Sequence, residues 1–456
     1  MTTARHLAEF LIHATPSGHA MEHAAMVVAS TLASAAYGTG IASAQIVSAM
    51  ARDKGGRPDA SIWFDNGPKL PVAEAARANA VLSDAAASDD SDLRNIVHAG
   101  TPAAASALAF AERDGADGEK VLRAIVLGYE AAGRIGEAIT PSFKDRGFHA
   151  CIAAAFASAV ASGIMLGLTV EQLTHTIALT ATSVGGIATA ADTSVSREYH
   201  AGAIVSAGVT AALAAQRGFA GEPRVLEAKR GFFEAFGGVD GVTAAAATLR
   251  GLGESWDIVT DMAIKLVPGG HPWHAIGEAA GNAARAGGLQ PSDIATITIH
   301  RPGMTALHPP LHPKDLIDMA HSPANFAAAG AADHGFAWVH ASAAKIADPV
   351  IHALIDKVRV GAEPVEHAGR YRQGATVVIG TTDGRSFSAT VFEPSGSAAL
   401  GISWAQIAEK YRTLMPAAGV TDAAIEASLT AIQGFRELTG VSALIRSLGA
   451  ASRIVP

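Results

Sequence analysis

The chain has 456 residues, of which 49% are hydrophobic and only 17% are charged, a composition that excludes a disordered or fibrous protein and predicts a large folded one. Lys and Arg total 34 against 42 Asp and Glu, and the resulting net charge of −8 argues against nucleic acid or an anionic membrane as a partner. The single cysteine excludes an intrachain disulfide and argues against a zinc site built from cysteines. The start of the chain is charged and amphipathic, so no signal peptide is expected. Together these features predict a cytoplasmic protein.

Helical patterns follow one another from residue 1 to about residue 260, separated by turn signals. Alanine is frequent and aromatic residues are only 5% of the chain, which favours closely packed helices. Thr169 is predicted to cap a helix that begins at Val170. The uncharged segment Ala150–Val170 has the length of a membrane span, but it is mostly Ala, Gly and Ser and is therefore predicted to be a buried central helix. Ala60–Phe64 is the one strand expected in this part.

Strand patterns appear after about residue 265. Ile294–His300 alternates between apolar and polar residues, and the runs 375–379 and 386–392 flank the turn signal Asp383-Gly384, which predicts a β-hairpin. Helical patterns lie between them and return from Trp404. The sequence therefore predicts a mainly α protein, with a large all-helical domain formed by residues 1–264 and 399–456 and an α+β lid domain, 265–398, inserted into it.

Standard cofactor motifs are missing from the sequence. There is no phosphate-binding GxxxxGK[ST] loop and no HExxH zinc motif. His308 and His312 are separated by prolines, so they cannot align on a helix and are expected in a solvated loop. No cofactor and no metal site are predicted.

Polar residues set in apolar surroundings give a more specific signal. The segment that begins at Lys265 lies at the predicted domain junction, where ligand clefts form, and its Gly-Gly-His-Pro sequence requires special backbone conformations. A lysine with several histidines and arginines suits the binding of a small polycarboxylate and the movement of a proton α to a carboxylate. The candidate residues are Asp90, Arg94, His98, His149, Arg197, His200, Lys265, His271 and His274.

Four segments make the chain resemble the MmgE/PrpD family. This resemblance extends over nearly the whole chain and implies a helical domain with an α+β lid, a homodimer, and cofactor-free chemistry on small polycarboxylates. The family includes 2-methylcitrate dehydratase, cis-aconitate decarboxylase and iminodisuccinate epimerase. The segments are Val121–Gly136, Leu166–Gln172, Gly208–Phe219 with Gly231–Phe233, and Glu409–Arg412.

The resemblance also assigns roles to the candidate residues. His98, His149 and Lys265 match positions of catalytic residues in the family. The other six are expected to bind the substrate, with either His271 or His274 facing it. These six are Asp90, Arg94, Arg197, His200, His271 and His274.

Departures from the family pattern decide the predicted reaction. Dehydratases and decarboxylases of the family usually contain the motif His-x-Leu-Asp-Phe-Asp-Asp-Thr-His. The matching segment of this chain, Asp84–Asp92, reads Asp-Ala-Ala-Ala-Ser-Asp-Asp-Ser-Asp, so only Asp89 and Asp90 persist. In addition, Gly330 replaces a tyrosine of the lid. Dehydration needs an acid for the hydroxide leaving group, whereas epimerisation needs only proton removal and return. The sequence therefore predicts an isomerase, an epimerase of a substrate such as iminodisuccinate. A dehydratase or decarboxylase is the first alternative, and a non-catalytic dimeric scaffold is the second.

Overall fold

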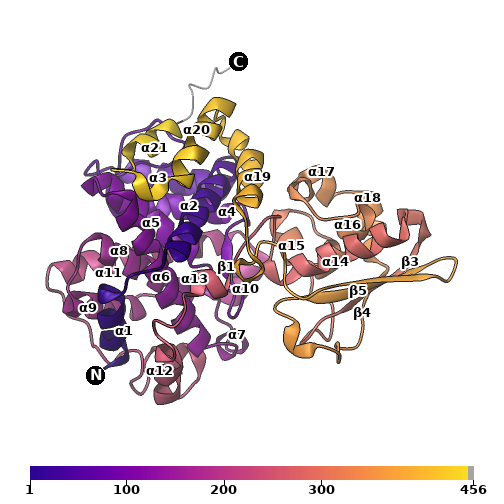
Figure 1. Ribbon diagram of the computed structural model, residues 1–456, viewed down its shortest axis with the longest axis horizontal. Coiled ribbons are helices and arrows are strands. Elements are labelled where there is room, and N and C mark those ends of the chain that lie inside the picture. The colour runs from indigo at the N-terminus through magenta and orange to yellow at the C-terminus, as the bar shows by residue number, and fades with distance from the viewer. Residues whose placement is uncertain (450–456) are drawn as a thin grey trace. The chain divides into compact units, whose positions relative to one another are not determined.

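The computed structural model describes residues 1–449 of the chain (Figure 1). The chain divides into two compact units. One unit is continuous and runs from Lys265 to Ile402, and the other joins Met1–Ile264 to the segment that begins at Ser403. Most of the described residues lie in helices, so the prediction of a mainly α protein is confirmed.

The first unit is built almost entirely from helices. Its helices are α1 (Thr3–His13), α2 (Gly18–Gly38), α3 (Ala42–Lys54), α4 (Val72–Ala85), α5 (Gly100–Asp114), α6 (Gly118–Ala138), α7 (Ser142–Asp145), α8 (Cys151–Met165), α9 (Val170–Ala181), α10 (Ala188–Thr193), α11 (Ser196–Gln216), α12 (Gly241–Leu249), α13 (Asp257–Thr260), α19 (Trp404–Leu414), α20 (Asp422–Gln433) and α21 (Ser442–Ser447).

Helix α8 is the centre of this unit. Every one of its residues is buried, and it packs against α5, α6 and α11. The close approach depends on small residues, since a Cβ atom at Gly208 of α11 would lie 2.6 Å from the backbone nitrogen of Ala159. The prediction of a buried central helix is therefore confirmed. Thr169 also caps α9 as predicted, in a capping box with Gln172.

No single helix among residues 1–449 has both the length and the apolar character needed to cross a membrane. Helices α2 and α3 meet the requirement only as a pair, and the chain bends by 95° between them.

A short antiparallel strand pair, β1 (Asp90–Asp92) with β2 (Met262–Ile264), was not predicted. Asp90 pairs with Ile264, and Asp92 with Met262. All residues of both strands are buried, so neither strand has the alternation that marks a half-exposed strand. The expected strand Ala60–Phe64 was wrong, because this segment forms only one isolated bridge, between Ala60 and Leu70.

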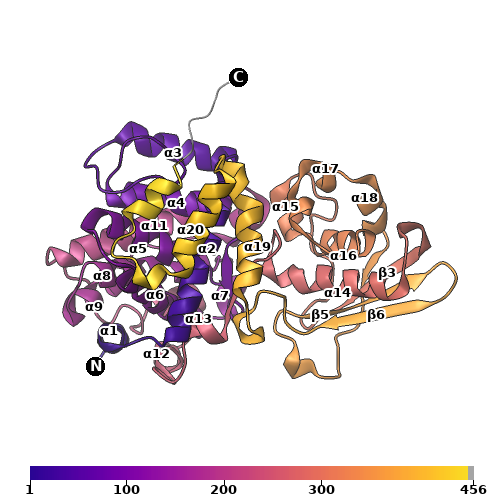
Figure 2. The same cartoon turned by 45° about the horizontal axis from the view of Figure 1, so that its top comes forward.

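The C-terminal helices α19 and α20 pack on α2 (Figure 2). The Lys410 side chain of α19 is buried. Its Nζ donates a hydrogen bond to Ser30 Oγ at 2.7 Å and another to the carbonyl oxygen of Ser88. Helix α19 therefore holds the loop that connects α4 to β1 in place.

The second unit is a four-stranded sheet of order β4-β3-β5-β6 packed against helices (Figure 1). Its strands β3 (Ile294–His300), β5 (Ala375–Thr381) and β6 (Ser386–Val391) are antiparallel neighbours, and β4 (Val358–Val360) runs parallel to β3. Buried residues alternate along β5, and the β5–β6 hairpin is confirmed. The helices are α14 (His271–Gly287), α15 (Leu316–His321), α16 (Pro323–Ala332), α17 (Ala343–Ile346) and α18 (Pro349–Ile355).

Candidate active site

A small cavity in the first unit gathers four of the residues predicted from the sequence: His98, His149, Arg197 and His200. They come from the loop after β1, the turn before α8, and the first five residues of α11. The free space is about 20 Å³, which holds one or two water molecules. The cavity is lined by Asp84, Asp89, His98, Thr101, Pro102, His149, Cys151, Ala154, Arg197, His200, Ala201 and Ile204.

Three acceptor groups surround one nitrogen of His98. Its Nδ1 lies 2.9 Å from Asp89 Oδ2, 2.6 Å from the carbonyl oxygen of Asp90 and 3.1 Å from Ser91 Oγ. Acceptors on this side place the imidazole proton on Nδ1 and fix the orientation of the ring. A carboxylate next to an imidazole also stabilises the imidazolium that forms when the ring accepts a proton.

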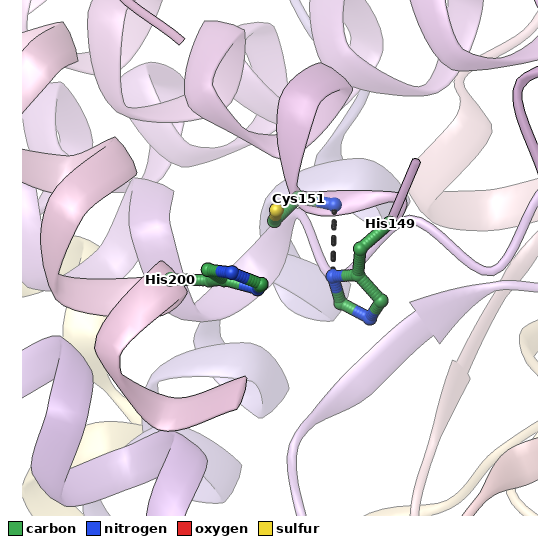
Figure 3. A group of neighbouring side chains, drawn as sticks. All are labelled: His149, Cys151 and His200. Carbon is green, nitrogen blue, oxygen red and sulfur yellow. Dashed lines mark hydrogen bonds between the residues drawn. The ribbon is translucent and has the colours of Figure 1, made fainter. Parts of the chain in front are cut away.

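Three imidazole rings lie close to one another in the cavity. The ring centroids of His98 and His149 are 6.2 Å apart, and those of His149 and His200 are 5.8 Å apart. Figure 3 shows His149 and His200 on either side of Cys151, with the backbone nitrogen of Cys151 donating to His149 Nδ1 at 3.3 Å. The backbone of His149 is held in turn by Gly186, whose carbonyl oxygen accepts from the His149 nitrogen at 3.1 Å.

Arg197 supplies a buried positive charge. Its guanidinium donates to the carbonyl oxygen of Asp84 at 2.5 Å and lies 3.4 Å from the Asp84 carboxylate. Burial lowers the pKa of Arg197, but the carboxylates of Asp84 and Asp89 outweigh that effect and the net shift is upward. Burial likewise lowers the pKa of His200, against the influence of Asp84. The cavity therefore combines a permanent cation with an imidazole that favours its neutral form.

Cys151 is a cavity residue that the sequence analysis did not select. Its thiol is buried, and burial raises its pKa to about 12, with Asp84 adding to the shift. The thiol is therefore protonated at neutral pH. A single cysteine with no partner motif in the sequence gives no signal that it adjoins two histidines.

Arg94 and Asp90 do not line this cavity, and their predicted roles in substrate binding stay predictions. The Arg94 guanidinium is surrounded by the carboxylates of Asp92, Glu137, Asp257 and Asp261. The Asp90 carboxylate accepts from the backbone nitrogens of Gly100 and Thr101, at 3.0 and 3.2 Å, and so caps the first turn of α5.

Lys265, His271 and His274 belong to the second unit. Lys265 follows β2 directly, and its side chain is only 2% exposed. His271 and His274 stand in the first turn of α14, are both buried, and have ring centroids 4.8 Å apart. His274 also lines a second cavity, of about 240 Å³, together with Glu278 and Phe336.

Two family models match the chain. The MmgE/PrpD N-terminal domain matches residues 3–252, and the MmgE/PrpD C-terminal domain matches residues 268–432. The chain belongs to the MmgE/PrpD family. This family includes dehydratases and related enzymes. The chain matched none of the curated proteins with which it was compared.

The candidate site residues can be placed relative to the two MmgE/PrpD matches. Every residue that lines the small cavity lies within the N-terminal match, as do Arg94 and Asp90. Lys265 falls between the two matched segments, and His271 and His274 begin the C-terminal match. The catalytic roles of His98, His149 and Lys265 stay predictions.

Proposed function

We propose that this MmgE/PrpD protein is a cofactor-independent epimerase that removes and returns a proton α to a carboxylate of a small polycarboxylate such as iminodisuccinate. The observation that carries the proposal is the cavity in which His98, oriented by Asp89, lies beside His149 and Arg197. Imidazoles can transfer protons at a carbon next to a carboxylate, and a buried guanidinium can stabilise the negative charge that develops.

The proposed reaction has two proton transfers and no net change in atoms. One imidazole takes the α-proton, and the electron pair of the broken C–H bond moves into the adjacent carboxylate to give an enediolate. Arg197 stabilises the negative charge that develops there. A second group then donates a proton to the opposite face of the carbon. Since the Nδ1 side of His98 is occupied by Asp89 and Asp90, proton transfer by His98 runs through Nε2.

The acidic segment Asp84–Asp92 supports epimerisation over dehydration. Its carboxylates already serve the protein itself: Asp89 contacts His98, Asp90 caps α5, and Asp92 pairs with Arg94. Dehydration needs a further acid that protonates the departing hydroxide. The imidazoles found at the two ends of this motif in dehydratases are replaced here by Asp84 and Asp92.

Substrate binding requires the cavity to widen. The free space of about 20 Å³ is far smaller than the pockets of roughly 300 Å³ and more that hold small organic ligands. The cavity wall formed by Arg197 and His200 lies at the start of α11, which closely follows the short helix α10. We propose that movement of this segment admits the substrate.

The test is proton NMR in deuterated water with iminodisuccinate isomers and, in separate samples, 2-methylcitrate and citrate. Deuterium at an inverted α-carbon, without alkene signals, is the result that supports the epimerase. Alkene protons from the citrates would instead support a dehydratase. A matched control is His312→Gln, since His312 is an exposed histidine of the second unit and its loss should leave the exchange rate unchanged, whereas His149→Gln should reduce the rate at least about 100-fold.

A further inference from the structure

We propose that His149, Cys151 and His200 form a zinc site, and that Zn²⁺ bound there inhibits the enzyme. One donor atom from each of the three residues lies within 4.8 Å of the others. Figure 3 shows both imidazoles next to the sulfur atom. No role in the proposed reaction is assigned to Cys151, so the site adds to the proposed function instead of restating it.

The donor set suits zinc. A thiolate with two imidazoles is a combination of soft and intermediate ligands that Zn²⁺ accepts, with water in a fourth, tetrahedral position. Bonds of about 2.0–2.3 Å place donor atoms around a tetrahedral zinc roughly 3.3–3.6 Å apart. The three donor atoms lie within 4.8 Å of one another, so at most small side-chain rotations are needed to close them around an ion.

The backbone at Gly186 lies next to two of the donors. A Cβ atom at this position would lie 2.2 Å from Cys151 Sγ and 3.8 Å from His200 Nδ1, so the thiol and the imidazole edge both face the space that glycine leaves open. His200 Nδ1 is buried and has no hydrogen-bond partner among the described residues. A buried nitrogen without a partner is costly, and coordination of a metal ion would satisfy it.

The size and charge of the cavity favour an ion. A free space of about 20 Å³ accepts one ion with a water molecule more readily than an organic ligand. Binding of Zn²⁺ releases the thiol proton to solvent and forms a zinc–thiolate bond, so the charge of the site rises by one. The carboxylates of Asp84 and Asp89 line the same cavity against the single cation of Arg197, and they favour this increase.

Inhibition follows from the loss of His149 as a proton carrier. A metal-bound imidazole nitrogen has no lone pair left to accept a proton. This consequence rests on the proposed function, but the zinc site itself does not.

The experiment is a titration of the full-length protein with Co²⁺, a spectroscopic substitute for Zn²⁺. Since the chain has one cysteine, a thiolate-to-cobalt charge-transfer band can arise only from Cys151. We expect this band in the wild type, its loss when Zn²⁺ is added, and its absence in Cys151→Ser. His200→Asn removes a ligand and should weaken cobalt binding at least about tenfold. Loss of a residue that only hydrogen-bonds to a ligand already weakens metal binding by about 10-fold to 100-fold.

The matched control is His312→Gln. His312 contacts His352 and Asp356 in an exposed cluster of the second unit, the kind of surface group that binds metals weakly, and its loss should leave the band unchanged. Circular dichroism verifies that each variant is folded. Absence of the band from the folded wild type, or a band of full strength in His200→Asn, would overturn the site. The band needs no substrate, so it separates failure of the zinc site from failure of the epimerase proposal.

Discussion

Asp89 contacts His98 at 2.9 Å and is expected to position this imidazole. Asp89→Asn keeps the shape of the side chain but removes the negative charge that stabilises the imidazolium. We expect kcat to fall at least about tenfold with a smaller change in KM, and the acidic limb of the pH–rate profile to move to lower pH. Asp114→Asn, at an exposed position, is the control. An unchanged pH profile in Asp89→Asn would contradict a positioning role.

His340 gives the second unit a dependence of stability on pH. The ring is buried, and burial lowers its pKa below the ordinary value of 6.5 in spite of the contact with Asp333. As the pH falls below about 6.5, His340 is therefore protonated in the unfolded chain before it is protonated in the folded chain. This difference makes the free energy of unfolding fall as the pH drops. Denaturant unfolding from pH 7.5 to 5 should show this decrease, and His340→Gln should reduce it. An equal decrease in both proteins would assign the effect to other groups.

Residue types and family resemblance predicted part of the cavity. His98, His149, Arg197 and His200 were selected from the sequence and lie together. The ion pairs of Arg94 were not predicted: Glu137 and Asp257, which are 43 and 163 residues farther along the chain, contact its guanidinium. Ion pairs between such distant segments leave no local pattern, so sequence reasoning could not find them.

At the scale of elements, an isolated antiparallel bridge between Phe148 and Ile187 brings the turn before α8 to the segment before α10. Gly186 stands at this crossing, and a methyl group there would collide with the Cys151 sulfur. Gly186→Ala should therefore lower the free energy of unfolding by about 1–3 kcal/mol. Gly185→Ala is a matched control, because a Cβ atom at Gly185 meets nothing within 4 Å. Equal stability of the two variants, measured by denaturant unfolding, would contradict the predicted collision.

The strands show which elements a sequence reveals. The strand Ile294–His300 was predicted with the bounds that the structure gives, because one face of its sheet is buried and its residues alternate. The three-residue strands β1 and β2 were missed. They are wholly buried, and the residues that pair, such as Asp90 and Ile264, are far apart along the chain. Pairing of distant short segments is set by tertiary packing, which a local pattern does not record.

At the scale of the whole molecule, Lys265 is the predicted catalytic group outside the first unit. Its side chain is 2% exposed, and a buried ammonium group needs compensation from its surroundings. Lys265→Ala should abolish turnover while leaving the helical circular dichroism signal intact. Lys229→Ala, at an exposed position, should do neither. Turnover near that of the wild type in Lys265→Ala would remove this lysine from the mechanism.

The homodimer that the family resemblance implies stays a prediction for the molecule as a whole. Light scattering at several protein concentrations would measure the mass in solution. A mass twice that of the chain supports the dimer, and a concentration-independent monomer would contradict it.

The most direct test of the central claim is the position of deuterium during the first turnovers of a single iminodisuccinate isomer in deuterated water. If one group removes the α-proton and another returns a proton on the opposite face, every inverted product molecule should contain deuterium from the solvent. The remaining starting isomer should keep its original hydrogen. Inverted product that retains the original hydrogen, or starting isomer that gains deuterium before any product forms, would contradict the account.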